Sequence, residues 1–164
     1  MMSSFATQSY VANGDGHQVL EWLGGTSMQV LLDSAHSQGA LTVVRTALNE
    51  GDAAPVHVHS REDEVFLVLA GGALVWSGDD RYEVGPGGIA FLPRDVPHTY
   101  RIIEDGTDML TICTPGGMDG FFRSAGHDVS TPKPEGWAIT AATLGAAAAA
   151  HGQQILGPPK GLDD

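Results

Sequence analysis

The chain has 164 residues, 42% of them hydrophobic and 17% charged, which is enough to bury one core without disulfides and suits a single domain. Its 20 acidic and 8 basic side chains give a net charge of −12, which repels phosphate and anionic lipid and so argues against nucleic acids and membrane surfaces as partners. Residues 1–20 lack both a basic start and an apolar stretch of signal-peptide length, so we expect a cytoplasmic protein.

From about Val19 to Thr114 the chain alternates short runs rich in Val, Leu and Ile with turns that contain Gly, Pro, Asn or Asp. This pattern predicts an antiparallel β-sandwich or barrel, and no periodic helix interrupts it. The runs are QVLEWLG (18–24), SMQVLLD (27–33), ALTVVRTAL (40–48), EVFLVLAG (64–71), ALVWSG (73–78), GIAFLP (88–93), HTYRII (98–103) and DMLTICT (108–114).

Helical signals follow the strands. GGMDGFFRSAG (116–126) predicts a short helix, and AITAATLGAAAAA (138–150) predicts a second, because Ala has the highest helix propensity. The Gly and Pro residues of GQQILGPPKGLDD (152–164) predict an irregular tail. We therefore expect an N-terminal arm (1–18), a barrel (19–115), and a C-terminal helical segment and tail packed on the barrel (116–164).

Two histidines stand one residue apart in PVHVHSREDE (55–64), which we interpret as the start of a strand. Residues i and i+2 of a strand point to one face, so His57 and His59 present both imidazoles on the same side, in a chelating arrangement. Glu64 shares its parity with the apolar inner residues of the next run, where a carboxylate is costly unless it is paired or bound to a cation. His98 opens a later run and supplies a fourth candidate ligand.

Other interpretations of these residues stay open at this point. A His-x-His pair by itself is equally well a pair of surface or hydrogen-bonded histidines. We interpret Glu62 and Asp63 as solvated turn acids, although a shift of register would make Glu62 the ligand in place of Glu64.

Two segments carry a family resemblance. GDAAPVHVHSREDEVFLVLAG (51–71) resembles the first signature of the cupin superfamily at every fixed position, which are Gly51, His57, His59, Glu64 and Gly71. The flanking phrases WLGG, TPGGMDGFF and ILGPP resemble the small single-domain bacterial cupins described as quercetin 2,3-dioxygenase-like.

GGIAFLPRDVPH (87–98) resembles the second cupin signature through Gly87, Pro93 and His98. It departs from that signature at Asp95, where the family usually has Gly, and at Ile102, where it often has Asn. Neither departing position is a ligand, so the departures affect the turn before His98 and the polarity of the inner wall.

The resemblance implies an all-β fold, a single cupin jelly-roll barrel of six to eight strands with short C-terminal helices. It also implies that His57, His59, Glu64 and His98 hold one divalent transition metal. Three imidazoles and one carboxylate suit Fe, Mn, Co, Ni, Cu or Zn, so the ligands do not select among these ions.

Parity predicts the neighbours of the metal. Phe66 and Val68 share the inner face with Glu64, and Tyr100 and Ile102 share it with His98. Phe91 is a further candidate, as is Trp76, although no ligand fixes the register of either. An apolar, partly aromatic pocket of this kind suits a flat organic substrate with one metal-binding oxygen group, but the same side chains equally well fill a small barrel.

The resemblance implies a metal-dependent dioxygenase of the quercetinase-like type, an oxidoreductase acting on a flavonol or another phenolic or enolic small molecule with O2 as co-substrate. In this hypothesis Glu64 is the catalytic base. An oxygen-independent, metal-dependent isomerase, cyclase or lyase of the cupin type is an alternative, and so is a non-catalytic cupin that binds a small molecule. The family tendency predicts a homodimer.

Overall fold

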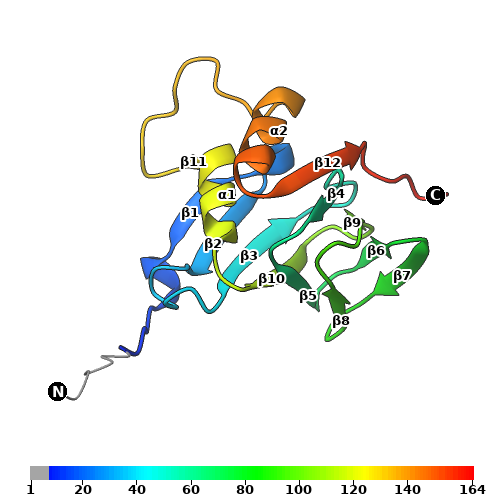
Figure 1. Cartoon of the computed structure of the whole chain (residues 1–164), viewed down its shortest axis with the longest axis horizontal. Coiled ribbons are helices and arrows are strands. Elements are labelled where there is room, and N and C mark those ends of the chain that lie inside the picture. The colour runs from blue at the N-terminus through cyan, green and yellow to red at the C-terminus, as the bar shows by residue number, and fades with distance from the viewer. Residues whose placement is uncertain (1–7) are drawn as a thin grey trace.

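In residues 8–164, the part of the chain that the computed structural model describes, twelve strands form two antiparallel sheets (Figure 1). Residues 1–7 of the expected N-terminal arm lie outside the described residues. The strands are Gln18–Glu21 (β1), Ser27–Leu32 (β2), Thr42–Leu48 (β3), Val56–His59 (β4), Asp63–Ala70 (β5), Ala73–Ser77 (β6), Asp80–Val84 (β7), Ile89–Leu92 (β8), His98–Ile102 (β9), Thr107–Thr114 (β10), His127–Asp128 (β11) and Gln153–Gly157 (β12).

The seven-stranded sheet has the order β11-β1-β2-β3-β10-β5-β8, and the five-stranded sheet has the order β12-β4-β9-β6-β7. Every run expected to form a strand contains one, so the predicted all-β jelly-roll class is confirmed. Burial alternates along the central strands. On β5, for example, Glu64, Phe66 and Val68 are buried, and the residues between them are partly exposed. One face of each sheet therefore packs inside the barrel.

Two strands depart from the sequence prediction. β7 pairs with β6 although four of its five residues are exposed, so it lacks the apolar alternation by which a strand is recognised. β12 forms in the segment expected to be an irregular tail, and it pairs with β4 from Gln153 opposite His59 to Gly157 opposite Val56. The prediction of an irregular tail was wrong here because the pairing with β4, and not local propensity, makes this segment a strand.

In the described part of the chain, two α-helices lie together beside the sheets, Met118–Ala125 (α1) and Ala141–Ala150 (α2), and two short 3-10 helices span Gly14–Gly16 and Leu23–Gly25 (Figure 1). A capping box starts α2: the Thr140 hydroxyl accepts a hydrogen bond from the Thr143 amide, and the Thr143 hydroxyl accepts one from the Thr140 amide. Neither α-helix has the length and apolar character needed to cross a membrane.

A buried carboxylate fixes α1 to the barrel. Asp119 accepts hydrogen bonds from the Ser34 amide (3.1 Å) and hydroxyl (3.1 Å), from the Thr42 hydroxyl (2.7 Å) and from Arg123 Nη1 (3.0 Å). The residue is 4% exposed, so these four donors replace the water that the carboxylate loses on burial.

The buried apolar side chains form two clusters. One joins β1, β2 and β3 to the helices and contains Trp22, Met28, Phe121, Phe122 and Leu144. The other fills the opposite part of the barrel and contains Leu48, Phe66, Val68, Ile102 and Met109. The candidate site lies where members of both clusters line one cavity.

Candidate metal centre

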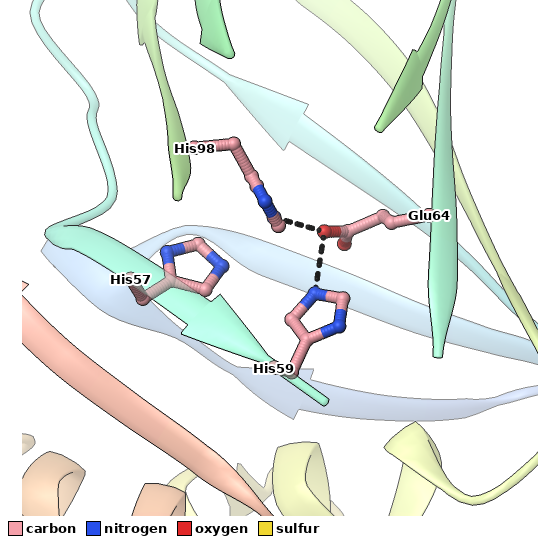
Figure 2. A group of neighbouring side chains, drawn as sticks. All are labelled: His57, His59, Glu64 and His98. Atoms are coloured by element: carbon pink, nitrogen blue, oxygen red, sulfur yellow. Dashed lines mark hydrogen bonds and ion pairs between the residues drawn. The ribbon is translucent and has the colours of Figure 1, made fainter. Parts of the chain in front are cut away.

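Three strands bring four potential ligands together. β4 supplies His57 and His59 on one face, β5 supplies Glu64, and β9 supplies His98, which is directly opposite His57 in the antiparallel register. Their ligand atoms all lie within 4.8 Å of one another. In residues 8–164 this is the one group of three or more His, Cys, Asp or Glu side chains with such spacing. Figure 2 shows the rings of His59 and His98 directed at one oxygen of Glu64, with His57 beside them.

Backbone carbonyls fix the tautomer of each histidine. The Nδ1 atoms of His57, His59 and His98 lie 2.8, 2.8 and 3.0 Å from the carbonyl oxygens of Pro55, Glu62 and Val96. A carbonyl only accepts, so each Nδ1 is the donor, and a neutral ring then keeps its lone pair on Nε2.

The Nε2 atoms converge on a carboxylate. Nε2 of His59 lies 3.2 Å, and Nε2 of His98 lies 2.8 Å, from Oε2 of Glu64. Lone pairs facing a carboxylate oxygen repel each other unless a proton or a cation lies between them. Because His59 and His98 are each 1% exposed and Glu64 is 4% exposed, water does not screen this repulsion.

The pKa values follow from this arrangement. Burial alone would raise the pKa of Glu64, but hydrogen bonds from His59 and His98, whose Nε2 atoms donate when these rings carry a second proton, hold it far below its ordinary value, so Glu64 is ionised. Burial alone would lower the pKa of His59, but the hydrogen bond and charge of Glu64 raise it. Burial, with the nearby His98, lowers the pKa of His57 to about 4, so His57 is neutral at pH 7.

The donor set fits a divalent transition metal. Three imidazole nitrogens of fixed tautomer and one ionised carboxylate provide ligands of borderline character, and a cation among them would remove the repulsion between their lone pairs. The second hydrogen bond of each ring, to a backbone carbonyl, is the kind that orients metal-bound histidines. Cys113 Sγ lies 3.9 Å from Glu64 Oε1, but burial and the charge of Glu64 raise its pKa well above the ordinary value, so it remains a neutral thiol.

Glu62 is not the solvated turn acid that the sequence predicted. It is 2% exposed, its Oε2 has no hydrogen-bond partner within residues 8–164, and that atom lies 3.9 Å from His59 Nδ1. Burial raises its pKa. The neighbouring Asp63 does lie at the surface, where it forms a salt bridge with Arg94 at 3.1 Å.

The turn before His98 also has a physical explanation. Asp95 has φ +65, a left-handed conformation in which Gly is unstrained and Asp is tolerated better than most residues. Its amide donates to the His59 carbonyl at 2.9 Å, which ties this turn to the end of β4. The departure from Gly at this position therefore leaves His98 in place.

An apolar cavity opens on the cluster through His57 and Glu64. Its remaining polar side chains are Thr46, Thr111, Tyr100 and Gln153, and no Lys or Arg lines it. Its apolar wall consists of Trp22, Leu23, Met28, Ala54, Pro55, Phe66, Met109, Met118, Phe121, Phe122, Leu144, Ala148 and Ile155. The lining therefore matches an uncharged ligand better than an acidic one.

The structure places the five candidate substrate residues in three different environments. Phe66 and Tyr100 line the cavity, with their rings edge-on at 5.5 Å. Val68 and Ile102 are buried in the second apolar cluster and do not line the cavity. Phe91 is 61% exposed, on the opposite face of β8 from the buried Leu92, so the structure does not bring it to the site.

Trp76, the further candidate from the sequence, is buried away from the cavity, where its Nε1 donates to the Asp164 carbonyl.

Several residues that do line the cavity were not singled out from the sequence. Gln153 lines the cavity from β12, and Met118 and Leu144 line it from α1 and α2. No motif includes these three residues. The sequence pointed to them only through the expectation that the C-terminal segment packs on the barrel.

Comparisons with known proteins agree with this geometry. Residues 44–115 match the model of the Cupin domain family, and this segment contains all four cluster residues. Two curated relatives are both quercetin 2,3-dioxygenases. The Bacillus subtilis protein is 26% identical over 114 residues, and the Aspergillus japonicus protein is 30% identical over 98 residues.

These matches cover 70% and 56% of this chain, and 33% and 28% of the relatives, so the chain spans about a third of their length. Among solved structures, KdgF from Halomonas sp. has a similar fold, with a TM-score of 0.59 at 20% identity over 68% of this chain and 98% of that one. The family model ends before α1, so α1, α2 and β12 all lie outside the matched residues.

Proposed function

Because the chain carries a cupin domain, we propose that it is a metal-dependent dioxygenase of the quercetinase-like type, acting on a flavonol or another uncharged phenolic or enolic molecule. One observation carries the proposal: a three-histidine, one-carboxylate cluster opens on a cavity with a mainly apolar wall, and within residues 8–164 no Lys or Arg lines it. The similarity to two quercetin 2,3-dioxygenases supports the same reaction class.

His57, His59, Glu64 and His98 would hold one divalent ion from the series Fe, Mn, Co, Ni, Cu and Zn. When bound, such an ion would supply Lewis acidity that lowers the pKa of a substrate hydroxyl. Glu64 would accept the proton of that hydroxyl on Oε1, which the neutral thiol of Cys113 contacts at 3.9 Å.

The cavity residues would bind and orient the substrate. Burial and the charge of Glu64 raise the pKa of Tyr100 well above its ordinary value, so its hydroxyl stays protonated and is a hydrogen-bond donor to a substrate oxygen. The Phe66 ring, edge-on to Tyr100, would hold an aromatic substrate and help to exclude water.

The absence of Lys and Arg from the lining bears on the choice of substrate. A dicarboxylate or a sugar acid would lose its hydration on entering this apolar wall without meeting a paired cation. A neutral aromatic hydroxyl compound would avoid this desolvation cost, since its one negative charge, on the deprotonated hydroxyl oxygen, would lie at the metal.

Oxygen uptake tests the proposal. The protein is stripped and reloaded separately with Fe(II), Mn(II), Co(II) and Ni(II), then mixed with quercetin and a panel of small phenols and enols. We expect uptake with at least one ion, lost in His59→Ala and retained in His36→Ala, because His36 is a half-exposed histidine outside the cluster. No uptake by protein of confirmed metal content would refute the dioxygenase assignment.

An oxygen-independent isomerase, cyclase or lyase is a second candidate. Glu64 and Tyr100 line the same cavity, where a carboxylate and a hydroxyl would stand on either side of a substrate whose proton moves between two positions. Conversion of a panel compound under anaerobic conditions would favour this candidate over the dioxygenase.

A further inference from the structure

We propose that Gln153 orients the substrate by hydrogen-bonding a second substrate oxygen, adjacent to the one bound at the metal. This inference rests on the proposed function and adds a recognition element to it. Gln153 comes from β12, outside the residues that match the family model, and it belongs to neither cupin signature.

The Gln153 amide is buried with little hydrogen bonding. The residue is 7% exposed and lines the apolar cavity, and its Nε2 lies 3.2 Å from the Met118 sulfur, its one side-chain partner in residues 8–164. A thioether is a weak acceptor, whereas an amide offers two N–H groups and two lone pairs. Because Gln153 lines the cavity and has only this weak partner, its amide keeps donor and acceptor capacity for a ligand.

The strand register places this amide beside the cluster. Gln153 lies opposite His59 on β4, and the sheet order β12-β4-β9 puts it on the other side of β4 from His98. Because paired residues of adjacent strands share a face, the Gln153 side chain projects to the same side of the sheet as the imidazole of His59.

Tyr100 lies on the opposite flank. β9 pairs with β4 through His98 and His57, so Tyr100, two residues beyond His98, lies toward the Pro55 end of β4 while Gln153 lies toward its His59 end. The Tyr100 hydroxyl also has no hydrogen-bond partner among the described residues. The Gln153 amide, bonded only to the Met118 sulfur, and the Tyr100 hydroxyl therefore stand diagonally across β4, with His57 between them.

This arrangement specifies a ligand type. A molecule bound at His57 and Glu64 meets hydrogen-bonding groups on both sides of its metal-binding oxygen and apolar walls elsewhere. An α-hydroxy enone, whose hydroxyl is adjacent to a carbonyl, presents oxygens in this pattern: the hydroxyl oxygen at the metal and the carbonyl oxygen to the Gln153 N–H.

Binding to the zinc-loaded protein tests the inference, since Zn(II) has no redox chemistry and so does not support oxidation. The probes are 3-hydroxyflavone, which has a carbonyl adjacent to its hydroxyl, and 2-naphthol, which has only the hydroxyl. The variants are Gln153→Met, which keeps the volume but loses the amide, and Gln154→Met, the same change at the adjacent exposed position on the opposite face of β12.

We expect Gln153→Met to weaken 3-hydroxyflavone binding about tenfold, the effect of losing one buried hydrogen bond, and to leave 2-naphthol binding unchanged. Gln154→Met should bind both probes like wild type. Equal 3-hydroxyflavone affinities in wild type and Gln153→Met would overturn the inference, as would an equal loss for both probes, which would indicate a packing role.

Melting temperature and zinc content establish that each variant is folded and loaded. If Gln153→Met does not fold, Gln153→Asn, which retracts the amide by one methylene, serves in the same comparison with the same expected loss. Failure of the zinc-loaded wild type to bind either probe would overturn the proposed function and this inference with it. Binding by wild type without any Gln153 effect would overturn the inference alone.

Discussion

His98 and Glu64 are joined across two strands by a 2.8 Å contact between Nε2 and Oε2, while Nδ1 of the same ring lies 3.0 Å from the Val96 carbonyl. One ring nitrogen is thus committed to the backbone and the other to the carboxylate. Turning the ring away from Glu64 would break both contacts, and the ring of His59 is held in the same way between the Glu62 carbonyl and Glu64.

Metal binding is expected to stabilise the fold. At a free metal concentration 100 times the dissociation constant, the gain in unfolding free energy is about 2.7 kcal/mol, which raises the melting temperature by about 5–10 °C for a domain of this size. Calorimetry with and without Co(II) or Zn(II) would measure the melting temperature, and elemental analysis would measure the metal content. Glu64→Gln should abolish the increase, and Asp63→Asn, a change at the adjacent exposed acid, should retain it. An equal increase in all three proteins would locate the metal elsewhere.

Glu62→Gln should have opposite effects on stability and metal affinity. The substitution removes a buried carboxylate with an unpartnered oxygen, which should raise the unfolding free energy of the metal-free protein by about 1 kcal/mol. It also removes a negative charge 3.9 Å from the Nδ1 of His59, which should weaken metal binding by about tenfold. Urea unfolding and metal titration would measure the two effects, and a loss of stability in the metal-free variant would contradict the first.

Asp119→Ala should destabilise the protein by about 3–5 kcal/mol, because it leaves the buried hydroxyl of Thr42, the Ser34 hydroxyl and amide, and Nη1 of Arg123 without their acceptor. Asp108→Ala provides the comparison, since it removes a more exposed acid whose salt bridge with Arg45 lies at the surface and should cost at most about 1 kcal/mol. The urea unfolding midpoints of the two variants, each compared with wild type, would measure the two losses of stability. Similar losses would show that the Asp119 network contributes no more than a surface salt bridge.

Asp33 should make part of the stability depend on pH. Burial alone would raise its pKa, but hydrogen bonds from the His36 amide and from Arg123 lower it from 3.8 to about 2. A carboxyl whose pKa is lower in the folded state stabilises the fold fully above its unfolded pKa, and this contribution disappears as the pH falls through the folded value. The stability difference between wild type and Asp33→Asn should therefore be constant above about pH 5 and shrink as the pH falls toward 2. A difference that is independent of pH across this range would rule out the ion pair with Arg123 as its source.

Much of the fold and the cluster could be predicted because both depend on local patterns. The period-two alternation of burial places His57 with His59, and Glu64 with Phe66, as soon as these segments are recognised as strands. The same parity indicates the inner position of Tyr100, since His98 fixes the register of β9.

The remaining features depend on contacts between distant segments. Phe91 lies on the outer face because Leu92, opposite Glu64, takes the inner position on β8, and the sequence of β8 alone does not reveal that register. β12 is a strand only because β4 has a free edge for it, and its Gly and Pro residues concealed this. Glu62 is buried although its local sequence is strongly polar.

The cavity wall and the ligand cluster come from different parts of the chain. The cluster lies within residues 44–115, whereas much of the wall facing it belongs to α1, α2 and β12. The side chains that shape the cavity can therefore change without any change in the cluster. A mutant library confined to residues 118–155 would vary the wall while His57, His59, Glu64 and His98 stayed as they are.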